Sequence, residues 1–492
     1  MLKTAKQHLD SLRDGRVVYV GSERIDDVTT HAYFRNAAQT IAGLFDLKRD
    51  PAHGRFAVME ENGEAFSSYY LKARSREDLD KRYQTHKLIA DASLGMFGRS
   101  PDHVSSFVTG MTLAKDVLGP YADNLDRYYE HLRKTDGYAT YAVLSPQSSR
   151  NPEFYKLRNL TSPSLRVVRE TDAGVVISGM KMLATGALFA NEIWIGNILP
   201  LAPDQAAESI TCAVPCNASG LALWARKPME PNAPNDFEGP LSHRFDESDA
   251  MLICDEVLVP WERVFVHNSP DLARQIYVRT AAHAYGNHQS NVRFLSKLQF
   301  LVGLASRITQ ATGADQVPAV KEAIGRLAAL EGMLGGTIQG QIHAAEDYPD
   351  GGWKCFNRRH VYAALNWCTE TYSEIVDKVR ELCGGGVFQM PANISVLEDE
   401  ELAARFAANW DTPQLGHIER MKLFKLAWDI VGSEFAGRHQ QYEKFYAGAS
   451  FIVRNYSYVH ADWGQLHGMV DGFMETYGVP GNAAEQPARV GA

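Results

Sequence analysis

The sequence predicts an α+β fold in which a β-rich middle part lies between two helical parts of a 492-residue chain. Changes in the hydrophobic period along the chain predict this order. Charged segments with helical spacing fill residues 1–137, apolar and polar residues alternate over 138–267, and long helical stripes recur in 268–492. We therefore expect an N-terminal helical domain, a middle β domain and a C-terminal helical bundle with these bounds.

The first part contains one long charged amphipathic segment, residues 76–96, and then a turn at residues 98–102 with the sequence GRSPD. A further long helix is expected after this turn. Ser100 or Asp102 is suited to cap that helix, because a side-chain oxygen at its start can accept a free backbone N–H.

Period-two segments dominate the middle part. Residues 165–169 and 175–178 flank the sequence TDAG at 171–174, which is a hairpin signal. Close strands with turn signals, and without alternating helices, indicate an antiparallel barrel or sandwich rather than a Rossmann unit. We take an antiparallel β-barrel as the expected form. Further strands are expected at residues 192–199, 209–214, 221–224 and 250–259.

Two apolar stripes predict long helices in the last part, which favours a bundle with little need for a sheet. The glycines at 384–386 are expected to end a helix, and the Ala/Gly/Pro-rich tail from Pro480 is expected to be mobile. The first stripe is Ile324, Leu327, Leu330, Leu334, Ile338 and Ile342, and the second is Leu415, Ile418, Met421, Phe424, Ala427, Val431 and Phe435.

Composition argues against several partners. The chain has 50 Lys plus Arg and 59 Asp plus Glu, so its formal net charge is −9, and it has no general attraction to nucleic acid or an anionic membrane. We find no apolar run typical of a signal peptide, and none near the roughly 18 residues of a membrane span. Six scattered cysteines indicate free thiols in a cytoplasmic protein. Cys212 and Cys216 have a metal-like gap, but no second pair follows at zinc spacing, so we expect no metal site.

Residues 136–150, DGYATYAVLSPQSSR, lie where the helical pattern gives way to the β pattern. A short apolar strand at 141–144 leads into a turn at Ser145 and Pro146. The residues after the turn are rich in hydrogen-bonding groups and suit a flat polar ligand, although the same composition also fits a simple exit from a strand. These residues are Gln147, Ser148, Ser149 and Arg150.

Five segments, spread in order over nearly the whole chain, resemble one enzyme family. The chain is similar to the oxygenase components of the HpaB-type two-component flavin monooxygenases, which include oxygenases for 4-hydroxyphenylacetate, halophenols and nitrophenols. The segments are GRSPDH at 98–103, YAVLSPQSSR at 141–150, ETDAGVVISGMKMLAT at 170–185, PLSHRFDESDAMLICDEVLVPWERV at 240–264 and HIERMKLFKLAWDIVGSEFAGRHQQYEKFYAG at 417–448.

The resemblance implies a fold similar to acyl-CoA dehydrogenase and a homotetramer. It also implies FAD as the cofactor, used as FADH2, with O2 as co-substrate and a phenolic or related aromatic substrate hydroxylated through a flavin C4a-hydroperoxide. The chain has no G-x-G-x-x-G after a strand, so no nicotinamide site is predicted. A separate NAD(P)H-flavin reductase is therefore expected to supply FADH2, by diffusion.

The resemblance also implies roles for single residues around the substrate. Arg99 would face the phenol oxygen, although an Arg in a turn can equally form a surface salt bridge of little energy. His103 and Tyr141 stand where the 4-hydroxyphenylacetate enzymes have Tyr and His, so the two have exchanged places around one substrate pocket, unless both simply pack. His288 is expected to be the base that takes the phenol proton, with His283 as its rival.

The flavin contacts implied by the resemblance lie in four segments. Thr185 would lie against the flavin ring near N5, although a β-branched residue is also ordinary in a strand. Tyr141 would contact both substrate and flavin, and Arg438 would hold the flavin or the pocket wall. The remaining implied contacts are Gln147, Ser148, Ser149 and Arg150, and Tyr446, Ala447, Gly448 and Ala449.

Two alternatives stand beside this prediction. A flavoprotein of the 4-hydroxybutyryl-CoA dehydratase or acyl-CoA dehydrogenase type would share the fold. The dehydratase needs a [4Fe–4S] cluster held by cysteines, but Arg99 and His103 occupy two of the cysteine positions. An acyl-CoA dehydrogenase would need a Glu base and does not fit the Arg99 turn. The second alternative is a helical binding scaffold that has lost catalysis.

Overall fold

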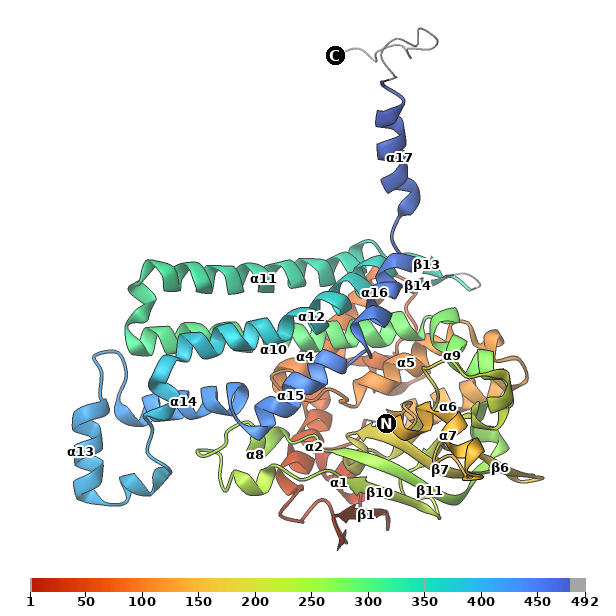
Figure 1. Ribbon diagram of the computed structural model, residues 1–492, viewed down its shortest axis with the longest axis horizontal. Coiled ribbons are helices and arrows are strands. Elements are labelled where there is room, and N and C mark those ends of the chain that lie inside the picture. The colour runs from red at the N-terminus through yellow and green to blue at the C-terminus, as the bar shows by residue number, and fades with distance from the viewer. Residues whose placement is uncertain (1, 349–350, 478–492) are drawn as a thin grey trace.

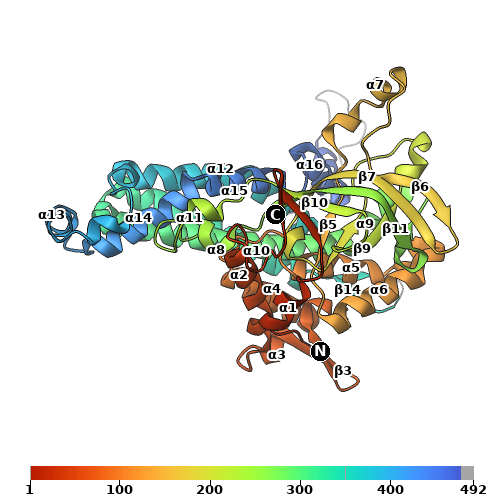
Figure 2. The same ribbon diagram turned by 90° about the horizontal axis from the view of Figure 1, so that it is seen from below.

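The computed structural model describes residues 2–348 and 351–477 of the chain. A long helical part lies on one side of the molecule and the larger β-sheet on the other, with the first helices below both in Figure 2. The tail from Pro480, which was expected to be mobile, lies outside the described residues.

Helices make up most of the first part, as predicted, and two strand pairs interrupt them. Runs of three or four residues are too short to show a period, which is why these strands were not predicted. Pro101 occupies the N-cap of α5, so neither Ser100 nor Asp102 caps it as expected. The elements are α1 Ala5–Ser11, β1 Val17–Val20, β2 Glu23–Ile25, α2 Arg35–Arg49, α3 Gly54–Ala57, β3 Val58–Glu61, β4 Glu64–Ser67, α4 Arg76–Ala92, α5 Asp102–Thr112 and α6 Ala122–Thr135.

The middle part contains the predicted strands, but the expected β-barrel is wrong. The strands of this part, together with β1 and β2, form two separate open sheets, one of six strands in the order β2-β1-β10-β11-β7-β6 and one of four in the order β12-β9-β8-β5. Two of the pairs, β1 with β10 and β5 with β8, are parallel. The elements are β5 Ala139–Ala142, α7 Pro152–Leu157, β6 Arg166–Thr171, β7 Gly174–Thr185, β8 Glu192–Ile195, β9 Thr211–Pro215, β10 Leu221–Ala225, α8 Ser242–Phe245, β11 Asp249–Pro260 and β12 Val264–Val266.

The barrel prediction failed because the hydrophobic period shows which face of a strand is buried but not which strand lies beside it. Strand β1, from the first part of the chain, pairs with β10 and extends the larger sheet. The predicted hairpin is confirmed, because β6 and β7 pair with Thr171 opposite Gly174. Gly174 has φ +156°, and a Cβ there would collide with the backbone of Val259, so glycine is needed at this turn.

The last part is a helical bundle. Helices α10, α11 and α12 are long and lie side by side, and Figure 1 shows them along the top of the molecule. The elements are α9 Pro270–Arg279, α10 Ala282–Thr312, α11 Pro318–His343, β13 Glu346–Tyr348, β14 Trp353–Cys355, α12 Arg358–Cys383, α13 Glu400–Trp410, α14 His417–Val431, α15 Glu434–Phe445, α16 Ser450–Val459 and α17 Trp463–Met474.

The predicted stripes pack into this bundle for most of their length. Leu327, Leu334, Ile338 and Ile342 of the first stripe are buried in α11. The second stripe is divided between two helices, because α14 ends before Gly432 and Phe435 lies in α15. Helix α17 differs from the others, since it stands away from the body of the molecule and none of its residues is buried.

Helix α5, strand β5 and the first half of α10 meet where the helical and β parts join. The GRSPD turn leads directly into α5, and the end of β7 lies beside β5. This junction therefore brings the segments named from the sequence into one interior region.

Candidate active site

Arg99 lies in the interior of this junction with only 9% of its surface exposed. Its guanidinium is 4.8 Å from the centre of the Tyr141 ring and 4.5 Å from that of Tyr446. Its Nη1 is 2.6 Å from Nε2 of His103. Among the described residues, no carboxylate lies within ion-pair distance of this guanidinium. We call Arg99, His103, Tyr141 and Tyr446 the Arg99 cluster.

His103 is held in one tautomer by Arg99. A guanidinium can only donate, so Nε2 of His103 accepts and its proton resides on Nδ1. Burial and the nearby Arg99 charge hold the pKa of His103 well below its usual range, so the ring is neutral. Its Nδ1–H has no partner among the described residues, although it is buried. A buried donor without a partner is costly, so this one points to a ligand acceptor.

The exchange predicted between His103 and Tyr141 brings the two side chains together. Their ring centres are 5.3 Å apart, and Phe107 packs 5.1 Å from His103 and 5.6 Å from Tyr141. Burial raises the pKa of Tyr141 to about 12, despite the opposing effect of Arg99, so its hydroxyl keeps its proton at neutral pH. The cluster therefore presents one cation, one neutral imidazole and several aromatic faces.

The backbone of Arg99 is fixed by residues that the sequence did not single out. Glu247 is fully buried and accepts a hydrogen bond from the Arg99 backbone N–H. Its other oxygen accepts from Nη2 of Arg438 at 3.2 Å. Gly98 allows this turn to pack on Tyr442, because a Cβ there would collide with the tyrosine ring. The acidic sequence FDESD at 245–249 was the available signal for Glu247.

Thr185 and Arg438 are brought together through Asp249. The Thr185 hydroxyl donates to the Asp249 carboxylate at 2.6 Å, and Arg438 donates to both oxygens of that carboxylate at 2.8 and 3.0 Å. The Nη1 of Arg438 is buried without a partner among the described residues. Two residues predicted from separate segments, one in β7 and one in α15, thus share a single buried anion.

The two loop segments predicted to hold the flavin differ in position. Tyr446 belongs to the Arg99 cluster, since its hydroxyl is 3.0 Å from Nε2 of His103. Ala447, Gly448 and Ala449 follow it and are partly exposed. Gln147, Ser148 and Arg150 are exposed and Ser149 is partly buried. The Ser149 hydroxyl and backbone N–H both donate to the Pro146 carbonyl within the same turn, at 2.7 and 3.0 Å.

The structure does not bring His288 into the Arg99 cluster. His288 is fully buried, its Nδ1 is 2.6 Å from Oε1 of Gln341, and its ring stacks 3.7 Å from Phe356. Its rival His283 lies on another face of α10, with its ring 6.3 Å from Phe107, which itself contacts His103 and Tyr141. Nδ1 of His283 is 3.0 Å from the Tyr362 hydroxyl.

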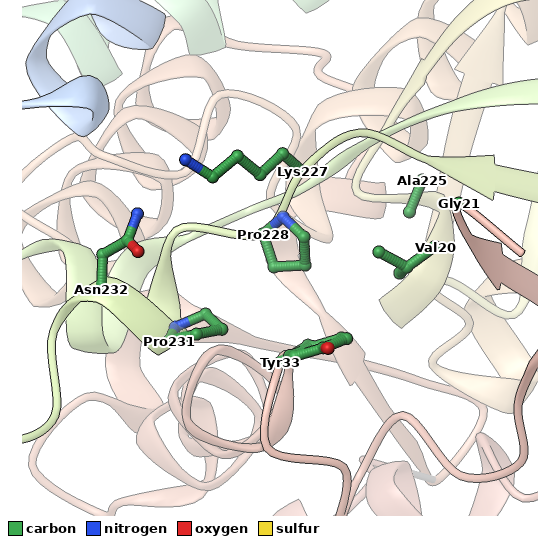
Figure 3. Close-up of a pocket in the computed structure, with 8 residues that line it drawn as sticks. All are labelled: Val20, Gly21, Tyr33, Ala225, Lys227, Pro228, Pro231 and Asn232. Carbon is green, nitrogen blue, oxygen red and sulfur yellow. The ribbon is translucent and has the colours of Figure 1, made fainter. Parts of the chain in front are cut away.

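Two surface hollows lie elsewhere. The first is lined by Val20, Gly21, Tyr33, Ala225, Lys227, Pro228, Pro231 and Asn232, and Figure 3 shows Tyr33, Pro228 and Pro231 around it. The second is lined by Arg226, Lys227, Met229, Glu434 and Arg438. Neither includes a residue of the Arg99 cluster.

Over the described part of the chain, no group of His, Cys, Asp and Glu side chains could hold a metal ion. Cys212 and Cys216, the pair with metal-like spacing, are both buried free thiols. No described helix is long and apolar enough to cross a membrane.

The fold places a buried cation among aromatic rings at the junction of the helical and β parts. Two family models match the chain, "4-hydroxyphenylacetate 3-hydroxylase N terminal" over residues 4–266 and "4-hydroxyphenylacetate 3-hydroxylase C terminal" over residues 273–475. The chain belongs to this family, as its sequence motifs predicted.

Individual relatives of this family align with more than nine tenths of the chain. The chain is 30% identical to the oxygenase component of 4-nitrophenol 2-monooxygenase from Rhodococcus sp, covering 97% of this chain and 93% of that protein. It is 31% identical to the 4-hydroxyphenylacetate 3-monooxygenase oxygenase component from Thermus thermophilus, covering 91% and 92%. A crystal structure of an HpaB oxygenase component complexed with FAD and 4-hydroxyphenylacetate matches with a TM-score of 0.90 at 28% identity, covering 96% of this chain and 98% of that one.

Proposed function

We propose that this chain is the oxygenase component of a two-component, FADH2-dependent monooxygenase that hydroxylates a phenolic substrate. The observation that carries the proposal is the buried Arg99 guanidinium, which has no carboxylate partner among the described residues and is flanked by aromatic rings. An unpaired buried cation is costly unless a ligand compensates it. A phenolate oxygen supplies the missing charge, and its ring suits the aromatic walls.

Arg99 favours the ionised form of the substrate. A free phenol has a pKa of about 10, and the ring is more electron-rich and more nucleophilic as phenolate. Lowering that pKa by about two units requires only about 2.7 kcal/mol of preferential interaction with the anion. A guanidinium in a closed, low-dielectric interior is well suited to provide it.

We assign the base to His283 in place of His288. His283 lies next to Phe107 at the edge of the Arg99 cluster, whereas His288 stacks on Phe356 and has its Nδ1 beside Gln341, away from that cluster. Burial lowers the pKa of His283 to about 4, so the imidazole is neutral at neutral pH. In the tautomer that donates Nδ1–H to the Tyr362 hydroxyl, Nε2 carries the lone pair that would take the phenol proton.

The chain also has residues that suit a flavin. Tyr446, Thr185 and Arg438 would hold the ring region, with 147–150 and 447–449 as flanking contacts. The buried, unpartnered Nδ1–H of His103 and Nη1 of Arg438 are donors that a polar ring system can satisfy. Bound reduced flavin would react with O2 and supply the oxygen atom transferred to the substrate. The closed interior would exclude water from that step.

The remaining partners follow from the same proposal. A separate NAD(P)H-flavin reductase supplies FADH2, by diffusion, to a cytoplasmic enzyme. The enzyme forms a homotetramer, and α17 is its natural contact: Leu466, Met469, Val470 and Phe473 follow helical spacing yet are exposed, with Met469 71% exposed. We expect wild-type protein to elute as a tetramer, and Met469→Glu combined with Phe473→Glu to elute as a smaller species.

For the substrate, the proposal names only a chemical class, the phenols. The relatives include an enzyme named for 4-nitrophenol and others named for 4-hydroxyphenylacetate. The His103 and Tyr141 exchange favours a substrate other than 4-hydroxyphenylacetate. The dehydratase alternative is disfavoured, because the six cysteines are buried free thiols at other positions.

A stopped-flow experiment tests the proposal. Anaerobic protein with reduced FAD is mixed with oxygenated buffer in the presence of a panel of phenols. We expect a transient absorbance distinct from both reduced and oxidised flavin, and a hydroxylated product from at least one phenol. Oxidation of the flavin at the rate seen without protein, with no product, would support the scaffold alternative instead.

A further inference from the structure

Thr185 and Asp249 form a pair across two strands of the larger sheet. Thr185 is the last residue of β7 and Asp249 the first of β11, and the two are direct partners in the antiparallel register. Directly opposed residues present their side chains on the same face. Accordingly, the Thr185 hydroxyl lies 2.6 Å from Oδ1 of Asp249.

Two guanidinium groups keep the Asp249 carboxylate charged. Arg438 contacts Oδ1 through Nη2 and Oδ2 through Nε, and Nε of Arg226 contacts Oδ2 at 2.8 Å. Burial by itself would raise the pKa of Asp249, but the two arginines outweigh it and hold the pKa well below its usual range. An ionised carboxylate can only accept hydrogen bonds. The single hydrogen of the Thr185 hydroxyl is therefore committed to Asp249.

A ligand that meets Thr185 thus finds lone pairs and no donor. This distinguishes the two redox forms of a flavin. In the reduced ring N5 carries a hydrogen and donates, whereas in the oxidised ring N5 carries a lone pair and accepts. Facing Thr185, the reduced ring gains a hydrogen bond and the oxidised ring places two acceptors against each other.

We propose that Asp249, acting through the hydroxyl of Thr185, makes this site select reduced over oxidised flavin. The inference rests on the proposed function, in which Thr185 faces the flavin ring. Asp249 is a positioning residue, since it acts on the flavin only through Thr185. The selectivity suits an oxygenase without a nicotinamide site, because oxidised flavin must leave before the next reduced molecule enters.

The chain offers a matched control in Asp246. Like Asp249, it is a carboxylate that accepts from Arg226, here through Nη2 at 2.5 Å, but its second contact is the Met229 backbone N–H and not Thr185. Asp246→Asn and Asp249→Asn therefore both remove one charge beside Arg226. Only the second replaces the acceptor of Thr185, because the NH2 group of the new amide can donate to the Thr185 oxygen and release its hydrogen.

The experiment measures the dissociation constants of oxidised and anaerobically reduced FAD, together with the midpoint potential of the bound flavin. We expect wild-type protein to bind the reduced form more tightly, and Asp249→Asn to lower that preference about tenfold, which is a fall of about 30 mV in the potential. Asp246→Asn should leave the ratio of the two constants unchanged. Thr185→Val should lower the preference as Asp249→Asn does, and Thr185→Ser should retain it.

The outcomes separate the two proposals. Equal ratios in wild type, Asp249→Asn and Thr185→Val would overturn the inference and leave the oxygenase assignment standing. A ratio lowered as much by Asp246→Asn as by Asp249→Asn would also overturn it, since charge alone would then be responsible. Failure of wild-type protein to bind FAD in either form would overturn the proposed function. If Asp249→Asn does not fold, judged by circular dichroism, the Thr185→Val and Thr185→Ser pair decides the matter.

Discussion

Two buried cations in this chain, Lys48 and Arg99, have opposite surroundings. The Nζ of Lys48 donates to both oxygens of Asp136 at 2.8 and 2.9 Å, and also to the hydroxyls of Ser67 and Tyr69 at 2.9 Å. The Arg99 guanidinium has one hydrogen bond, to a neutral imidazole, and otherwise faces aromatic rings.

The difference indicates what each cation is for. The charge of Lys48 is fully compensated within the protein, so it fastens α2 to the end of α6. The charge of Arg99 is not compensated by any described residue, so its counter-charge must come from outside the chain. Stability and ligand binding are therefore separable between these two sites, and mutations should affect them in different ways.

The largest effect should come from breaking the paired site. We expect Lys48→Met to lower the free energy of unfolding by about 3–5 kcal/mol, because Asp136 would remain buried without the cation that compensates its charge. Urea denaturation measures this loss. The double variant Lys48→Met with Asp136→Leu should regain most of it, since no charge is then left unpaired. A loss below about 1 kcal/mol in the single variant would contradict the comparison.

The unpaired site should respond in activity and not in stability. We expect Arg99→Met to lower kcat/KM for the phenol about 100- to 1,000-fold, because the developing negative charge loses its donor. Its free energy of unfolding should stay close to wild type, since no buried carboxylate loses a partner. Steady-state kinetics and urea denaturation on the same preparation test both statements. A destabilisation as large as that of Lys48→Met would show that Arg99 is structural.

His283 and His288 of α10 allow the same comparison of activity with stability within one helix. We expect His283→Ala to lower kcat about 100-fold, as for loss of a general base. His288→Ala should leave kcat near the wild-type value but lower stability by about 1–3 kcal/mol, because the buried Gln341 loses its partner. Single-turnover product formation distinguishes the two, and the reverse result would return the base to His288.

The smallest predicted effect concerns how the unfolding free energy depends on pH through the ionisation of Asp136. Burial opposes the charged form of Asp136, but Lys48 and Ser67 outweigh it and lower its pKa. A carboxyl whose pKa is lower in the folded state contributes stability above its unfolded pKa of about 3.9 and loses it as the pH falls further. The wild-type unfolding free energy should therefore fall more steeply below about pH 4 than that of the Lys48→Met, Asp136→Leu variant. Parallel curves would contradict the assignment.

Local pattern predicted much of this fold. The hairpin at 171–174, the stripe buried in α11 and the order of helical and β parts follow from residues close together in the chain. The family motifs also identified Arg99, His103, Tyr141 and Tyr446, which the structure brings into contact. Residue type and spacing are sufficient for such features because they depend on short-range geometry.

Sheet order and side-chain direction required the tertiary structure. The sequence did not show that β1 joins β10 or that the sheets stay open, because pairing partners can be far apart in the chain. It favoured His288 over His283 as the base, and this choice stays a prediction. Residues five positions apart on a helix differ by about 140° in direction, so the two histidines have different surroundings. Only packing decides which face is turned inward.

The sequence by itself determined the family, the order of elements and the identity of the cation at the site. The tertiary structure decided that this cation has no carboxylate partner among the described residues, that Glu247 and Asp249 lie behind Arg99 and Thr185, and that His103 is neutral with its proton on Nδ1. The physical reason is that charge compensation and proton position depend on distances of about 3 Å. Apart from Arg99 and His103, which are four positions apart, residues separated by 64 to 343 positions in the chain set those distances.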